Sequence, residues 1–172
     1  KSWINSFINI DDQIWLATNN GLIILNKDDK SQLDNELVDY FYNNSIYELK
    51  MTNDHIFIAS EAGLFIFDKQ INKIYGLKSF GYKSKDFIFP SDHFNYTAIT
   101  ENNDNLYFAN QSGIISFNLI NRQWSNVVEP SIYGSLEVKS IVLNKENIFI
   151  ATVNGLTQYD MINNSLEIFN YK

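Results

Sequence analysis

The side chains best suited to acid–base chemistry in this sequence are its two histidines, His55 and His93. His93 directly follows Ser91 and Asp92, which are the partner types of a serine-hydrolase triad. Triad groups converge from different structural elements, so a trio within three consecutive positions is not a triad. His55 precedes an apolar run, at the position that other parts of the chain give to Gln13, Asn105 and Asn147. We therefore predict that His55 is a solvated turn residue and that the protein is not an enzyme.

Oxygen-bearing side chains that could attract a cation gather at Asp11-Asp12, at Asp28-Asp29 and at residues 102–104. None of these clusters has the ligand series of an EF-hand loop, so we predict that they are solvated turns. The chain contains no cysteine, which excludes disulfides, thiolate metal sites and cysteine nucleophiles but leaves the compartment open. We therefore predict no catalytic residue, no bound metal and no cofactor.

The length and charge of the chain limit the kinds of partner that we expect. The chain has 172 residues, with 13 Lys+Arg against 20 Asp+Glu, a formal net charge of −7 and a pI near 4.7. A phosphate backbone calls for a clustered basic surface, so we predict no nucleic-acid partner. The apolar runs fall far short of the ~20 residues that span a bilayer, so no membrane insertion is predicted for this segment. The length supports one ordinary domain.

Glycine and alanine are scarce, yet they recur together at one spacing. Four of the seven glycines follow an alanine in the pattern Ala-x-x-x-Gly, and these glycines are 42, 50 and 42 residues apart. Apolar runs flank each polar turn, which predicts a β-hairpin in which glycine supplies a positive φ. The small alanine predicts a close approach by a neighbouring sheet. The structural repeat residues are Ala17, Gly21, Ala59, Gly63, Ala109, Gly113, Ala151 and Gly155.

Two further apolar segments flank each hairpin, which makes four strands per repeat, the number in a β-propeller blade. We predict an all-β fold: a single β-propeller over residues 1–172, with four four-stranded antiparallel blades, that is part of a larger propeller. The predicted blades cover approximately residues 3–35, 45–79, 95–127 and 137–171. The fourth strand of the first blade is the weakest, because polar residues 26–30 come first and the next apolar residue is Leu33. A β-sandwich is the alternative, but it does not explain four near-equal repeats.

The repeat, as in Ile14-Trp15-Leu16-Ala17-Thr18-Asn19-Asn20-Gly21-Leu22, resembles the two-component regulator propeller repeat of bacterial hybrid two-component proteins. All four copies match, and the second half of each copy also resembles quinoprotein-type repeats. The resemblance implies a periplasmic or extracellular, non-catalytic sensor propeller that recognises a small molecule or a glycan fragment. Members of that family usually have more than four blades, so further blades of the parent chain are expected partners. In isolation, we expect the chain either to close as a four-bladed ring or to pair with a second copy that covers its end blades.

Two other functions stay open at this stage. A protein-interaction or assembly scaffold of a secreted or surface protein would use a broad propeller rim with aromatic anchors. An enzyme or cofactor propeller of the quinoprotein type is disfavoured, because no set of acids, bases or metal ligands repeats or clusters in the sequence. Repeat motifs specify architecture rather than chemistry.

The longer interval between Gly63 and Gly113 predicts an extended loop, and extended loops often carry function. In a propeller, the connections between blades and the hairpin turns lie on one rim, so aromatic side chains there are expected to contact a ligand or partner. The alternative is that Phe87 and Phe89 pack under the loop as a small satellite core. The candidate ligand or partner face consists of Tyr82, Phe87, Phe89, His93, Tyr40, Tyr42 and Tyr133.

Overall fold

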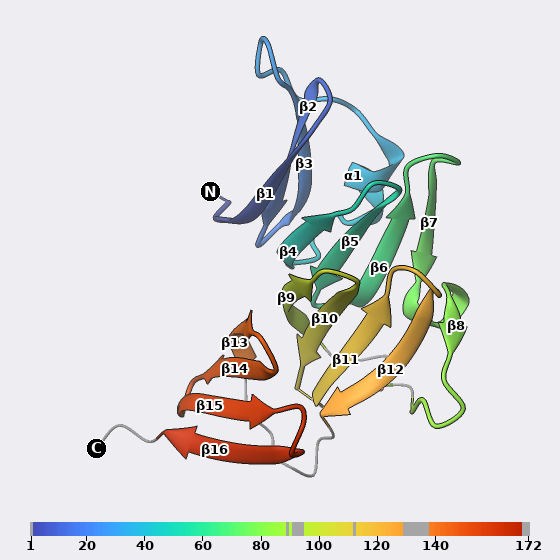
Figure 1. Cartoon of the computed structure of the whole chain (residues 1–172). Helices are drawn as coiled ribbons and strands as arrows, with labels where there is room; N and C mark the ends of the chain where they lie inside the picture. The colour runs from blue at the N-terminus through green and yellow to red at the C-terminus, as the bar shows by residue number, and fades with distance from the viewer. Residues whose placement is uncertain (1, 89, 91–94, 112, 129–137, 170–172) are drawn as a thin grey trace. The chain divides into compact units, whose positions relative to one another are not determined.

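The computed structural model describes residues 2–88, 90, 95–111, 113–128 and 138–169. Its strands form four sheets, each built around an antiparallel meander (Figure 1), which confirms the predicted all-β class and the number of sheets. The chain divides into two compact units, Lys1–Phe80 and Gly81–Lys172. Each unit contains two of the sheets.

The first sheet departs from the predicted four strands. It consists of β1 (Ile4–Ile10), β2 (Gln13–Thr18) and β3 (Gly21–Asn26). Where the fourth strand is expected, a single β-bridge joins Leu25 to Gln32. The Asn26 side chain accepts the N–H of Asp28 at 2.8 Å, as the equivalent side chains do in the other repeats. The residues after this turn stay polar up to Leu33, so they supply no apolar strand.

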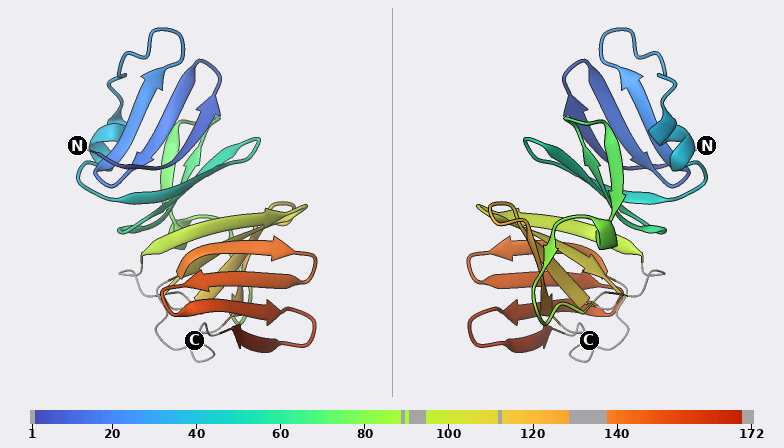
Figure 2. Two further views of the ribbon diagram at one scale, coloured as in Figure 1. Left: turned by 90° about the vertical axis from the view of Figure 1, so that its left-hand side faces the viewer. Right: turned by 90° about the vertical axis from the view of Figure 1, so that its right-hand side faces the viewer.

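A short helix, α1 (Glu36–Tyr40), follows this bridge and lies beside β3 (Figure 2). The helix begins at Asn35, whose side-chain oxygen accepts the N–H of Leu37 at 2.8 Å, as an N-cap does. Leu37 and Phe41, which directly follows the helix, are both buried in the core of the first unit. Helix α1 therefore supplies apolar side chains that the single β-bridge does not.

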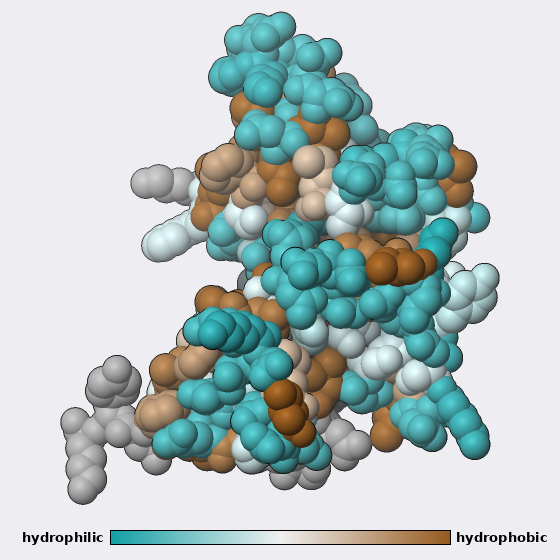
Figure 3. All heavy atoms as spheres, viewed as in Figure 1, coloured by the Kyte–Doolittle hydropathy of each residue, from teal (hydrophilic) through white to brown (hydrophobic). Residues whose placement is uncertain are grey.

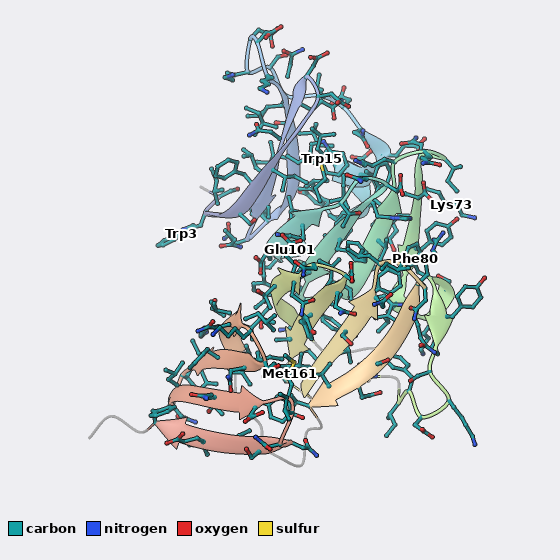
Figure 4. The ribbon with its side chains drawn as sticks, viewed as in Figure 1. Trp3, Trp15, Lys73, Phe80, Glu101 and Met161 are labelled. Atoms are coloured by element: carbon teal, nitrogen blue, oxygen red, sulfur yellow. The ribbon has the colours of Figure 1, made fainter. Side chains whose placement is uncertain are left out.

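The second sheet is a four-stranded antiparallel meander, as predicted, and the core of the first unit lies between it and the first sheet. Trp15 and Ala17 of β2 pack in one cluster with Ile56 and Ile58 of the second sheet, and Trp15 is labelled in Figure 4. The elements after α1 are β4 (Ile46–Met51), β5 (His55–Ser60), β6 (Gly63–Asp68), β7 (Lys73–Gly76) and the 3-10 helix η1 (Leu77–Ser79).

The third sheet is a four-stranded meander with an additional edge strand, β8 (Tyr82–Lys83), which pairs in parallel with β12 (Figure 1). The fourth sheet is a four-stranded meander. Besides β8, the third sheet contains β9 (Tyr96–Asn102), β10 (Asn105–Asn110), β11 (Gly113–Asn118) and β12 (Gln123–Val128). The fourth sheet contains β13 (Val138–Asn144), β14 (Asn147–Thr152), β15 (Gly155–Asp160) and β16 (Ser165–Phe169).

The core of the second unit repeats the arrangement of the first. Tyr107 and Ala109 of β10 pack in one cluster with Ile148 and Ile150 of β14. Three phenol side chains lie in this unit's interior, those of Tyr96, Tyr107 and Tyr159, and burial raises the pKa of all three. A buried phenol resists ionisation because its charged form would lose hydration.

The repeat glycines adopt the predicted backbone conformation. Their φ values are +115° at Gly21, +128° at Gly63, +135° at Gly113 and +134° at Gly155. Beside them, Ala17, Ala59 and Ala109 are completely buried, whereas Ala151 is half-buried. The alanines of β2 and β10 belong to the two intersheet cores, which confirms that a small side chain occurs where another sheet packs closely.

The turn after each third strand is also repeated. A carboxylate or amide oxygen at the strand end accepts the N–H of the residue two positions on, at 2.8–3.1 Å. These four side chains are Asn26, Asp68, Asn118 and Asp160. The Asx turn thus ends the third strand in every repeat. Among the described residues, no helix has the length and apolar character needed to cross a membrane.

Candidate ligand-binding cleft

Two of the predicted contact residues, Tyr40 and Tyr42, lie in the connection between the first two sheets. Both are exposed, Tyr40 to 52% and Tyr42 to 69%. The Tyr40 ring meets the ring of Phe41 edge-on at 5.0 Å and that of Phe65 at 5.6 Å. These contacts hold Tyr40 against β6, while more than half of its surface is open to a ligand.

This connection is joined to the hairpin turns on either side of it. The Ser45 hydroxyl donates to the carbonyl of Asn19 at 3.0 Å, and the Glu61 N–H donates to the Ser45 carbonyl at 3.0 Å. A Cβ added to Gly21 would lie 2.5 Å from the Phe41 carbonyl oxygen. In the first unit, the connection and the two hairpin turns therefore lie together on one rim, as the propeller prediction requires.

Sequence reasoning did not identify the cleft that lies beside α1. It has a volume of about 390 Å³, within the range of small-molecule sites. Leu37 and Phe67, both 7% exposed, supply apolar lining. The full lining is Asn35, Glu36, Leu37, Tyr40, Phe67, Asn72 and Ile74. The sequence signal for it is the N-cap pattern Asn35-Glu36-Leu37, which starts a helix where the repeat predicts a strand.

The cleft places several unused polar groups around one aromatic ring. Within the described part of the chain, the side-chain polar atoms of Glu36, Tyr40 and Asn72 make no hydrogen bond. Asn72 has a φ of +52°, in the turn between β6 and β7. A carboxylate, a phenol and an amide together can donate and accept hydrogen bonds, and the ring offers an apolar face. Such a lining suits a neutral ligand rich in hydroxyl groups.

The predicted loop residues of the second unit are arranged differently from the expectation. Tyr82 is 70% exposed and pairs with Gln123 at the start of β12, at the opposite end of the sheet from the Gly113 hairpin turn. The prediction that Tyr82 shares one rim with the hairpin turns is therefore wrong. The added residues first return along the outer edge of the third sheet as β8. Phe87 is half-buried, while Phe89, His93 and Tyr133 lie outside the described residues.

The attachment of this segment to β12 is specific. The Tyr82 N–H donates to the Arg122 carbonyl at 2.7 Å. The Asn126 side chain accepts from the Ile88 N–H at 2.9 Å and donates to the Ile88 carbonyl at 3.3 Å. Gly81 has a φ of +67°, and a Cβ there would lie 2.8 Å from the Arg122 carbonyl oxygen. Glycine is therefore required where the segment first meets the sheet.

His55 is not the solvated turn residue that was predicted. Its ring meets Phe80 edge-on at 4.9 Å, and its side chain is 12% exposed. Its Nε2 atom lies 3.6 Å from an oxygen of Asp68. Phe80 comes after the 3-10 helix that follows β7 (Figure 4), so a contact distant in sequence covers the histidine. Among the described residues, no three His, Cys, Asp or Glu side chains are grouped as metal ligands would be.

Comparisons with known proteins show which solved structures have a similar fold. No family model matches the chain, and no curated protein matches it. Among solved structures, an extracellular domain of B. thetaiotaomicron, from a protein described as the hybrid two component system BT4673, matches with a TM-score of 0.74 and 17% identity. That match covers 98% of this chain and 22% of that chain.

Two further matches agree in architecture. The corresponding extracellular domain of BT3049, also from B. thetaiotaomicron, has a TM-score of 0.73 at 16% identity over 98% of this chain and 25% of that chain. The WD40 repeats of RRP9 have a TM-score of 0.67 at 9% identity over 99% of this chain and 52% of that chain. At these identities the likeness shows the fold: the four sheets match propeller blades. This chain spans a quarter or less of the length of the two bacterial domains.

Proposed function

We propose that this chain is a non-catalytic ligand-recognition module of a bacterial two-component signalling protein, located in the periplasm or outside the cell. The observation that carries the proposal is the match of 98% of the chain, at TM-scores of 0.73 and 0.74, to extracellular domains described as parts of hybrid two-component systems. In this role the propeller binds a signal molecule and transmits the event through other parts of the protein.

The cleft beside α1 is the proposed ligand site in the first unit, and a short glycan is the proposed ligand. Sugar hydroxyl groups can pair with Glu36 and Asn72, while the C–H face of a sugar ring can pack on Tyr40. The apolar lining by Leu37 and Phe67 excludes water from that contact. Binding by such a site needs orientation rather than chemistry, which agrees with a non-catalytic role.

Isothermal titration calorimetry of the whole chain with a panel of short neutral and acidic oligosaccharides tests this proposal. Asn72→Gly is a favourable variant because glycine tolerates the positive φ there, and Glu36→Gln removes only the charge. Asn72→Gly should weaken binding about three- to tenfold through loss of one hydrogen bond. Glu36→Gln should weaken it by a similar factor because its hydrogen bond is no longer assisted by charge. Asn43→Gly is the matched control: Asn43 also has a positive φ, +60°, but it does not line the cleft.

Different outcomes of these titrations test the location of the site and the proposed recognition of glycans. Binding that is weakened by the control but not by the cleft variants would move the site to the rim near Tyr42. Absence of saturable binding to every oligosaccharide would overturn glycan recognition. The second candidate, an interaction scaffold, is favoured by the exposed aromatic rings of Trp3 and Tyr42, 74% and 69% accessible, because such rings often anchor protein interfaces.

A further inference from the structure

The side chain of Asn35 keeps one hydrogen-bonding group for a ligand. Its Oδ1 atom accepts the N–H of Leu37 at 2.8 Å, and its backbone carbonyl accepts the N–H of Val38 at 2.9 Å. Within the described part of the chain, its Nδ2 atom makes no hydrogen bond. The Oδ1 bond fixes the plane of the amide, so Asn35 brings an oriented N–H donor to the lining of the cleft.

Glu36, the next residue in the sequence, brings an acceptor to the same lining. Its carboxylate has two oxygens that accept hydrogen bonds, and among the described residues neither oxygen receives one. A ligand amide carries the complementary pair, because its carbonyl can accept from Asn35 and its N–H can donate to Glu36. Hydroxyl groups can also donate and accept, so the polar groups alone do not identify the ligand.

The apolar part of the lining distinguishes a sugar that carries an amide from one that carries only hydroxyl groups. Leu37 and Phe67 are both 7% exposed, and Ile74 is half-buried. Figure 3 shows apolar surface bordered by hydrophilic side chains in the first unit. An acetamido group adds a methyl to its amide, and burial of that methyl against apolar side chains strengthens binding about fourfold. A hydroxyl group in the same place gains no such contact.

The charge of the lining disfavours acidic sugars. Lys73 precedes Ile74, and neighbouring residues of a strand point to opposite faces of a sheet. The Lys73 Nζ atom lies 5.1 Å from the centre of the Tyr75 ring, on the face away from Ile74. None of the described residues that line the cleft is basic, so a ligand carboxylate or sulfate would meet Glu36 without a counter-ion.

We propose that the cleft recognises the acetamido group of an N-acetylated amino sugar. The amide carbonyl accepts from Asn35, and the amide N–H donates to Glu36. The methyl group packs on Leu37 and Phe67. The C–H face of the sugar ring packs on Tyr40, which is 52% exposed. This inference rests on the proposed recognition of a short glycan and names the kind of sugar.

A set of trisaccharides that differ at one position of each ring tests the proposal. Tri-N-acetylchitotriose carries an acetamido group there, cellotriose a hydroxyl group and chitotriose an amino group. In isothermal titration calorimetry of the whole chain, tri-N-acetylchitotriose should bind about tenfold tighter than cellotriose, because it adds a hydrogen-bonded amide and a buried methyl.

Substitutions of Asn35 separate its role in the cleft from its role in the fold. Asn35→Ser and Asn35→Asp both keep an N-cap oxygen, so the melting temperature should stay near that of the unchanged protein. Both remove the Nδ2 donor, so the preference for tri-N-acetylchitotriose over cellotriose should fall about three- to tenfold. Asn20→Ser is the matched control, because Asn20 is exposed in a hairpin turn and does not line the cleft.

A preference for tri-N-acetylchitotriose that both Asn35 variants lose and the control keeps supports the proposal. Equal binding of cellotriose, or an unchanged preference in the Asn35 variants, would overturn it while glycan recognition stands. Tighter binding of chitotriose would also overturn it, because amino groups would then pair with Glu36 as cations. Binding of other oligosaccharides but of none of these trisaccharides would overturn this proposal alone, whereas absence of binding to every oligosaccharide would remove glycan recognition as well.

Discussion

Gly21→Ala and Gly63→Ala compare one substitution at equivalent positions of two hairpins. Both glycines have a large positive φ, +115° and +128°, so alanine is strained at either site by about 1–2 kcal/mol. The surroundings differ. The new Cβ would lie 2.5 Å from the Phe41 carbonyl oxygen at Gly21, whereas nothing lies within 4 Å of it at Gly63.

The cost at Gly21 must include a movement of backbone, because the obstructing atom is a carbonyl rather than a flexible side chain. Overpacking of this kind typically costs about 1–3 kcal/mol. We therefore expect Gly21→Ala to lower the free energy of unfolding of the first unit by about 1–3 kcal/mol more than Gly63→Ala does. The displaced segment carries Tyr40 and Tyr42, so the first variant should also disturb the rim.

Urea unfolding of both variants gives the difference in stability, and hydrogen–deuterium exchange locates it. In Gly21→Ala, the Glu61 N–H, which is bonded to the Ser45 carbonyl at 3.0 Å, should exchange faster than in the unchanged protein. In Gly63→Ala, the exchange of residues 41–45 should stay as it is. Equal losses of stability in the two variants would refute the argument from the Phe41 carbonyl.

Other substitutions probe the second unit. Gly81→Ala places a Cβ 2.8 Å from the Arg122 carbonyl at a φ of +67°, so β8 should detach and amide exchange in β12 should rise; unaltered exchange there would contradict the strand pairing. Asn126→Ala removes both hydrogen bonds to Ile88 and should cost about 1 kcal/mol in urea unfolding, with no loss counting against an ordered attachment. Burial raises the pKa of Tyr96, so the folded state keeps the proton where the unfolded chain releases it, and stability should fall above about pH 10. Tyr96→Phe should reduce that fall by up to about 1.4 kcal/mol per pH unit, and an identical alkaline profile in the variant would show that another group controls it.

Much of the fold is predictable because the repeat combines three local signals. The apolar runs specify strands, the glycines require a positive φ, and the Asx residues end the third strands. All three act within a few residues, so a single sequence reveals them. The four sheets and the conformation of Gly21, Gly63, Gly113 and Gly155 follow directly.

The departures arise where distant segments decide the outcome. The N-cap at Asn35 could be recognised locally, but its competition with the fourth strand depends on how Leu37 and Phe41 fill the core. His55 looks exposed in sequence and is covered by Phe80 from a later segment. The edge strand at Tyr82 depends on Arg122 across the sheet. The cleft results from the first of these departures, so strand periodicity alone does not reveal it.

The short strand β8 has a consequence for self-association of the third sheet. An uncovered outer strand offers a row of backbone donors and acceptors to any extended peptide. In this protein the N–H groups of Tyr82 and Ser84 occupy the backbone carbonyls of Arg122 and Trp124 along that side, and the backbone of Ile88 bonds to the side chain of Asn126. The insertion therefore protects this edge against pairing with strands of other chains. Its removal is expected to promote aggregation even where the remaining meander stays folded.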